Sequence, residues 1–166
     1  MAAKEDSLCG DTLTFHNLSL YDHFLDLIGS GRGDQVLVYD GAAEFTISDI
    51  KDMVDRASGV LLHQLRIKDT KEPQVIGLLV RPSAERVAYM LAILKIGSAF
   101  LSLDTCLPSH RMERMIAESN VQFVIVSSGE TWNLANDLNV TVLEDLLSDT
   151  QTTTSMVYSI PQNPLV

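Results

Sequence analysis

Residues 75–126 read VIGLLVRPSAERVAYMLAILKIGSAFLSLDTCLPSHRMERMIAESNVQFVIV, and this stretch decides the fold. Apolar runs of strand length lie at residues 74–80, 99–103 and 121–126, and segments with helical periodicity fill both intervals. A continuous apolar run is typical of a strand that is buried on both faces, and therefore of a parallel sheet. Strands that alternate with helices of this length predict an α/β fold of βαβ units with right-handed crossovers.

Local signals set the ends of the two helices in this stretch. Ser83 can accept the first N–H groups of a helix, and Gly97 stands where a left-handed residue would end it. Pro108 suits the first turn of the second helix, where its missing N–H costs nothing. An i,i+4 ion pair between Arg114 and Glu118 is expected on the outer face of that helix. Its inner face is expected to carry Met112, Met115 and Ile116.

The residues before this stretch predict a helix, a hairpin and a second helix. Ser19 can cap a helix that runs to about Ile28, and the glycine-rich residues 29–33 then break the chain. The tight-turn signal at residues 40–41, Asp-Gly, lies between strands predicted at 35–39 and 44–47, which would sit at a sheet edge or form a small sheet of their own. Ser48 can cap the second helix. The apolar stripe of that helix is Ile50, Val54, Ala57, Leu61 and Leu65.

The remaining segments are weaker in pattern. Residues 1–18 are expected to form a loose lead-in, and residues 68–73 and 151–154 to form polar loops. Short helices are predicted at 130–138 and 143–148, around a brief strand at Thr141-Val142. Residues 158–166 have the look of the start of another strand.

The helix predicted from Ser83 to Ile96 is apolar around most of its circumference, and a helix of that kind needs cover on most sides. One sheet covers only one face, and we expect the neighbouring elements to be too few to supply the rest. The chain is therefore expected to be an incomplete part of a larger α/β body, with uncovered apolar surface open to association. One stripe of this helix is Val87, Met90, Leu91 and Leu94, and the second is Tyr89, Ile93 and Ile96.

Composition argues against several classes of protein. The net charge is −10, and no Lys, Arg or His follows Arg114, so the acidic C-terminal part would repel nucleic acid. The longest apolar run, residues 87–94, is too short to cross a membrane, and the first residues lack the apolar core of a secretory signal. We therefore expect a cytoplasmic protein with no nucleic-acid or membrane partner. Cys9 and Cys106 lack metal-site spacing and are expected to be reduced thiols.

Patterns that would carry chemistry are scarce. Residues 29–33 leave a helix and enter a strand, which is the reverse of the order that a dinucleotide fingerprint needs. Asp104 follows a strand, where catalysis is common, but Asp also forms turns, and an Arg111–Asp104 ion pair would lock such a turn. We assign no catalytic, cofactor-binding or metal-binding residue. Surface or structural roles are expected for the four histidines, His16, His23, His63 and His110.

Four segments resemble motifs of adenylate-forming enzymes, the superfamily of acyl-CoA synthetases and peptide-synthetase adenylation domains. Residues 91–104, LAILKIGSAFLSLD, resemble LAxLKAGaAYvPlD, and residues 107–112, LPSHRM, resemble the YPxeRl that follows it. Residues 44–50, EFTISDI, are similar to the xlTYxEL before the family's first long helix, and residues 121–127 to its LLT strand. The order and spacing agree over about residues 20–166. Three residues depart from the pattern: Leu107 replaces an aromatic residue, and Ser102 and Thr105 replace prolines.

The resemblance implies that residues 19–166 are a partial AMP-dependent synthetase/ligase domain, the first subdomain of the large N-terminal domain, truncated before the phosphate-binding loop. The lysine-poor, divergent form looks most like the aminoadipate-semialdehyde dehydrogenase-like or β-alanine-activating acyl-CoA synthetases. In the family, the carboxylate of an acid or amino acid attacks the α-phosphate of ATP, with Mg²⁺ screening the phosphates. The thiol of coenzyme A or of a carrier phosphopantetheine then takes the acyl group from the adenylate.

The family's phosphate loop is rich in Gly, Ser and Thr, ends in Lys, and follows a strand that resembles Leu165-Val166 onward. The ribose-binding Asp and the catalytic Lys come later still. The resemblance therefore implies an acid–thiol ligase fragment that is inactive alone. The alternative is a non-catalytic interaction module derived from the same fold. A nicotinamide-dependent oxidoreductase lacks the fingerprint that it would need.

Overall fold

The computed structural model of the protein describes residues 19–67, 73–104, 106–127, 140–144, 146–147 and 156–157. The predictions for residues 1–18, 68–72, 130–138, 151–154 and 158–166 lie outside the described residues, as do Cys9 and His16. No helix within the described ranges is long and apolar enough to cross a membrane. The elements are α1 (Leu20–Gly29), β1 (Val36–Asp40), β2 (Ala43–Thr46), α2 (Ile47–Ile67), β3 (Val75–Leu79), α3 (Ala84–Lys95), β4 (Ala99–Ser102), α4 (Ser109–Glu118), β5 (Phe123–Val126), β6 (Thr141–Glu144) and β7 (Met156–Val157).

The main sheet is mostly parallel, as predicted. Its strand order is β4-β3-β5-β6-β7, and only the pairing of β7 with β6 is antiparallel. Because β4 and β5 both pair with β3, the chain crosses over β3 between these two strands. The hairpin of β1 and β2 forms a separate two-stranded sheet. Of the two positions expected for the hairpin, a sheet of its own is therefore the observed one.

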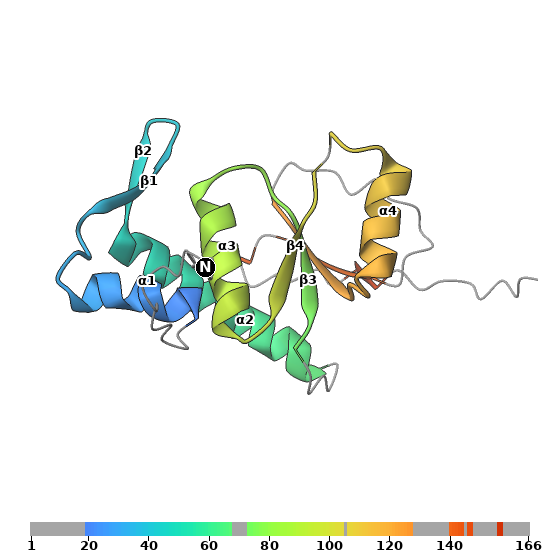
Figure 1. The fold of residues 1–166 in the computed structure, drawn as a ribbon, viewed down its shortest axis with the longest axis horizontal. Helices are drawn as coiled ribbons and strands as arrows, with labels where there is room; N and C mark the ends of the chain where they lie inside the picture. Colours follow the sequence, from blue (N-terminus) through green and yellow to red (C-terminus); the bar gives the residue numbers. More distant parts are fainter. Residues whose placement is uncertain are drawn as a thin grey trace, which may run out of the picture.

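Helices cover both faces of the main sheet. Figure 1 shows α3 between α1 and the strands, with α4 on the opposite side of the sheet. The α2 helix packs mainly against α3. Two apolar cores result. The first joins α1, α2 and α3 to one face of the sheet, and the second joins α4 to the other.

Alternate residues of the central strands enter the two cores. In β3, Leu78 lies in the first core and Leu79 in the second. In β5, Ile125 lies in the first core, while Val124 and Val126 lie in the second. These strands are therefore buried on both faces, which confirms the interpretation of their continuous apolar runs.

Helix termini follow the predicted signals at three places. Ser19 forms a reciprocal capping box with Asp22, and the Ser83 hydroxyl accepts the Arg86 N–H at 3.2 Å. Gly97 follows α3 with a φ of +75°, which confirms its left-handed conformation. On α4, the Arg114 Nε atom lies 2.6 Å from Glu118, and Met112 and Ile116 are buried beneath.

The N-cap predicted for α2 is wrong by two residues. Ser48 lies within the helix, and Thr46 is the cap: its hydroxyl accepts the Asp49 N–H at 3.1 Å. The Thr46 N–H donates back to the Asp49 carboxylate at 2.9 Å, which completes a capping box with Asp at the third helical position. Because β2 ends at Thr46 and the helix begins at once, the cap has to stand there and not at Ser48.

The helix predicted at 143–148 is also wrong. Leu143 and Glu144 belong to β6, where Leu143 pairs with Ile125 of β5 and is fully buried, and a turn follows at residues 146–147. The spacing of Leu143, Leu146 and Leu147 fits a helical stripe. Pairing with β5 prevails because it satisfies the backbone groups of a strand that lies in the interior.

The cover of α3 is larger than expected, because α1 and α2 supply it. Tyr89 and Ile93 are completely buried, so the expectation that nearby elements could not cover the second stripe is wrong for these residues. The other stripe is less enclosed. Its members Val87, Met90 and Leu94 are half-buried and face α1.

An ion cluster joins the three helices on this side of the sheet. The Asp55 carboxylate on α2 lies 2.6 Å from the Nζ atoms of both Lys51 and Lys95. The Lys95 Nζ atom, which comes from α3, also lies 5.7 Å from the ring centre of Tyr21 on α1. Burial alone would raise the pKa of Asp55, but the hydrogen bonds from Lys51 and Lys95 outweigh it and lower the pKa from 3.8.

We predict that Asp55→Asn weakens the pH dependence of stability on the acid side. A lowered pKa in the folded state means that Asp55 contributes stability above the ordinary carboxyl value, and that this contribution is lost as pH falls through the folded pKa. Urea unfolding at several pH values should therefore show a wild-type advantage that is full at pH 7 and fades between about pH 5 and pH 2.

The matched control is Asp34→Asn, which removes the charge of an exposed carboxylate outside this cluster. If the wild-type protein exceeded Asp55→Asn in free energy of unfolding by the same amount at pH 7 and pH 2, the role assigned to Asp55 would be contradicted. An equal loss of stability at pH 7 in Asp34→Asn would contradict it as well.

Candidate functional site

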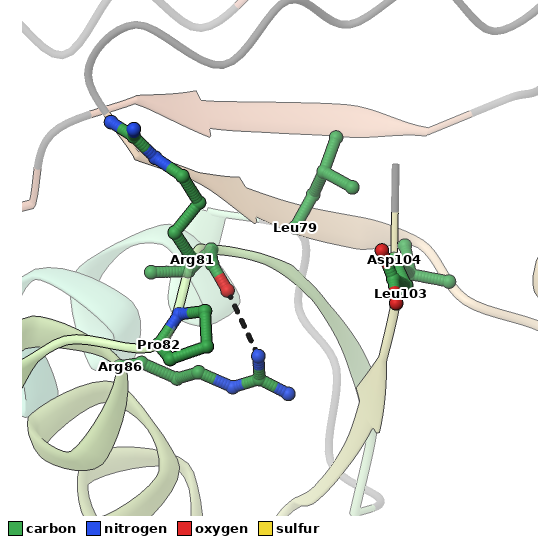
Figure 2. A pocket seen from close by; sticks show the side chains of 7 residues that line it. Leu79, Arg81, Pro82, Arg86, Leu103 and Asp104 are labelled. Carbon is green, nitrogen blue, oxygen red and sulfur yellow. Dashed lines mark hydrogen bonds between the residues drawn. The ribbon is translucent and has the colours of Figure 1, made fainter. Parts of the chain in front are cut away.

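The carboxyl ends of β3 and β4 form the natural place for a site, because ligands of open α/β sheets bind beyond the carboxyl ends of the strands. A small cavity of about 110 Å³ lies there. Figure 2 shows its lining side chains, and the Arg81 side chain extends away from the Arg86 guanidinium. We call this cavity the strand-end pocket; it is lined by Leu79, Val80, Arg81, Pro82, Arg86, Leu103 and Asp104.

Arg86 joins the ends of the two strands. Its Nη1 atom donates to the Val80 carbonyl at 3.2 Å, as Figure 2 shows, and its Nη2 atom donates to the Ser102 hydroxyl. Ser102 is one of the positions where the sequence departs from the proline of the family motif, and a proline would offer no side-chain acceptor. Sequence reasoning missed Arg86, and the signal that points to it is the unexpected hydroxyl at Ser102.

Asp104 acts as a turn former. Its carboxylate accepts the Cys106 N–H at 2.8 Å, which is the side-chain hydrogen bond of an Asx turn. Hydrogen bonds from Cys106, with a smaller effect of the Arg86 charge, hold the pKa of Asp104 below 3.8. The described residues show no Arg111–Asp104 ion pair, so that prediction is wrong: Arg111 is exposed on α4, and the carboxylate is already engaged by Cys106.

Side chains of the protein itself occupy the N-terminus of α3. The Ala84 N–H donates to the Asp40 carboxylate of the hairpin at 3.1 Å, and the Arg86 N–H donates to Ser83. A helix N-terminus binds phosphate when its N–H groups point freely at the ligand, usually after a glycine-rich turn. Residues 80–83, Val-Arg-Pro-Ser, contain no glycine. This strand-to-helix turn is therefore closed by internal hydrogen bonds and lacks the form of a phosphate loop.

The strand-end pocket does not fit a nucleotide, and the described residues form no site for its metal. Sites for ligands of nucleotide size occupy roughly 300 Å³ or more, and the strand-end pocket has about 110 Å³. Within the described part of the chain, no three His, Cys, Asp or Glu side chains gather as a metal site. We therefore derive no reaction step through ATP or Mg²⁺ from these residues.

The other sequence candidates lie apart from the strand-end pocket. His23, His63 and His110 are exposed on α1, α2 and α4, as expected of surface residues. Cys106 is exposed beside the Asp104 turn. The glycine-rich residues 29–33 connect α1 to β1, and Gly31 has a φ of +78°, which confirms an ordinary loop.

Peptide synthetases are among the known proteins of similar sequence. The chain is 32% identical over 97 residues to AM-toxin synthetase AMT1 of Alternaria alternata, covering 58% of this chain and 2% of that protein. It is 32% identical over 114 residues to the nonribosomal peptide synthetase fmqC of Aspergillus fumigatus. This match covers 68% of this chain and 9% of that protein. The chain thus spans less than a tenth of the length of either relative.

Solved structures share the fold. The structure of Klebsiella oxytoca NpsA with 3-hydroxyanthranilyl-AMSN aligns with a TM-score of 0.66 and 16% identity, over 87% of this chain and 28% of that one. The nonribosomal peptide synthetase FmoA3 aligns with a TM-score of 0.67 and 20% identity, over 87% of this chain and 15% of that one. The fold is therefore that of the N-terminal subdomain of adenylation enzymes.

The match to a family settles the assignment, since residues 29–164 match the family described as AMP-binding enzyme. The expected branch of aminoadipate-semialdehyde dehydrogenase-like and β-alanine-activating synthetases stays a prediction. The order of motifs, the parallel sheet and the family match agree: this chain belongs to the AMP-binding, adenylate-forming enzymes.

Proposed function

We propose that this chain is the first part of a domain that activates a carboxylic or amino acid with ATP and passes the acyl group to a thiol. The observation that carries the proposal is the family match over residues 29–164. The acceptor thiol would be coenzyme A or a carrier phosphopantetheine. Support for coenzyme A comes from one structural neighbour, which is named an anthranilate CoA ligase, and support for a carrier comes from the relatives named as peptide synthetases.

We further propose that the chain contributes a scaffold and does not catalyse adenylation alone. The described strand-to-helix turn after β3 is closed by Asp40 and Ser83, and the strand-end pocket is too small for a nucleotide. The sequence also contains no Lys after Arg114, whereas the leaving pyrophosphate needs a cation and free N–H groups. On this proposal the domain runs over residues 19–166, and the phosphate loop is not among them.

The second candidate function is a non-catalytic interaction module. Its support is an apolar groove of about 370 Å³ between α1 and α3, which a partner could fill. The two functions differ in a simple observation, because docking through this groove requires concentration-dependent association.

ATP–pyrophosphate exchange tests the scaffold proposal. The purified 166-residue chain, assayed with a panel of carboxylic and amino acids, should show exchange no faster than a blank without protein. An intact adenylation enzyme of the family serves as the positive control in the same buffer. Acid-dependent exchange by the 166-residue chain would contradict the proposal.

Sedimentation velocity over a wide range of protein concentration tests the second candidate function, the non-catalytic interaction module, against the scaffold. We expect one species whose sedimentation coefficient does not change with concentration. Reversible association, combined with absence of exchange, would favour the interaction module over the scaffold.

A further inference from the structure

The α1 helix is held to the rest of the protein by few side chains. Of its ten residues only Tyr21 and Phe24 are buried, and Leu20 at its start is 63% exposed. Figure 1 shows the helix on the side of α3 away from the strands, and an apolar groove of about 370 Å³ lies between the two helices. An element with few buried apolar contacts opens at a lower free energy than the core. The packing of α1 therefore favours local opening.

Hydrogen bonds of its own close both ends of α1. Ser19 and Asp22 form the capping box at its start. At its end, the N–H groups of Gly31 and Arg32 donate to carbonyl groups of the last turn, at 2.9 and 3.1 Å. Caps of this kind oppose fraying from the termini, so the helix is expected to be lost as a whole. The link at residues 29–33 contains three glycines, which lets the chain rotate there.

A lysine at the end of α3 connects α1 to the other two helices. The Lys95 Nζ atom lies 2.6 Å from the Asp55 carboxylate on α2 and 5.7 Å from the ring centre of Tyr21 on α1. The Lys95 side chain is 30% exposed, so water screens these contacts only in part. A cation attracts the face of an aromatic ring, and the attraction grows as water is removed. Lys95 therefore stabilises the docked position of α1, while Asp55 holds its ammonium group in place.

From these contacts we propose that α1 is a strap that opens as one unit about residues 29–33, and that Lys95 is the latch that holds it closed. In the open form, Tyr21 and Phe24 leave the core, and the side of α3 that contains Met90 and Leu94 becomes exposed. A helix of ten residues is marginal in water without a partner, so opening also melts α1. This inference does not depend on the proposed function.

Hydrogen exchange, read residue by residue by NMR on the full 166-residue chain, measures this opening. The amides of residues 24–29 should share one protection factor, because a single event exposes them all. That factor should be at least about tenfold lower than those of residues 54–61 in α2 and 88–93 in α3, which open with the core.

Two sites of substitution separate local opening from global unfolding. Lys95→Gln should speed exchange in α1 about two- to fivefold, because it removes the cation from the Tyr21 ring, and Lys95→Arg should restore the wild-type rate. Ile116→Val trims the core on the α4 side of the sheet. It should speed exchange in the interiors of α2 and α3 about two- to tenfold and leave the α1 amides at their wild-type rate.

A double-mutant cycle tests the latch itself. Tyr21→Leu removes the ring and keeps an apolar side chain at this position. Exchange in α1 should then be faster than in the wild-type chain, and Lys95→Gln should cause no further increase in this background.

Four outcomes would overturn the proposal. Protection of α1 equal to that of α2 and α3 would mean that the three helices open together. An equal increase in all three helices with Ile116→Val would mean the same. Exchange rates graded along α1 from Leu20 would show fraying from one end in place of a strap. A full effect of Lys95→Gln in the Tyr21→Leu background would show that Lys95 does not act through the Tyr21 ring.

Discussion

Burial of β3 on both faces is the constraint on which the rest of the structure depends. Ile76 and Leu78 enter the core with α2 and α3, and Leu79 enters the core with α4. Full burial of one such side chain stabilises the fold by about 1.5–3 kcal/mol. Both layers of helices are therefore held to one strand. A Cβ atom at Gly77 would lie on the α4 side of the strand, 2.8 Å from Val124 Cγ2 and 3.2 Å from Leu103 Cδ1, so the second core leaves no room there for a side chain.

The position of this strand sets the chemistry at its end. Arg86 and Ser102 tie the carboxyl ends of β3 and β4 together, and Asp40 ties the hairpin to the first turn of α3. These interactions hold the two strand ends, the hairpin and α3 together at this edge of the sheet.

Much of the fold could be predicted from the sequence, since the deciding signals are local. Apolar runs locate β3 and β5, and Ser83 and Gly97 locate α3, because strand burial and helix caps depend on neighbouring residues. The helix predicted at 143–148 failed because pairing with β5 is a long-range interaction that outweighs local periodicity. The complete burial of Tyr89 could not be predicted either, since periodicity does not reveal which helix packs on which face of α3.

The site was less predictable than the fold. The turn at Asp104 follows from the preference of Asp for such positions, and that preference is local. The bonds of Arg86 to Val80 and Ser102 depend on how α3 lies across two strands, so no spacing rule reveals them. The same holds for Asp40, which caps a helix that begins 44 residues later in the chain.

The most direct test of the central constraint compares two glycine-to-alanine substitutions by urea unfolding. Gly59 lies within α2, is exposed and has open space around it, so Gly59→Ala should stabilise the protein by about 0.5–1 kcal/mol. Gly77→Ala adds the same methyl group to the packed second core, on the α4 side of β3, and should destabilise the protein by about 1–3 kcal/mol. If Gly77→Ala were as stable as the wild-type protein, the α4 side of β3 would not be tightly packed, and the account of β3 as a strand buried on both faces would be wrong.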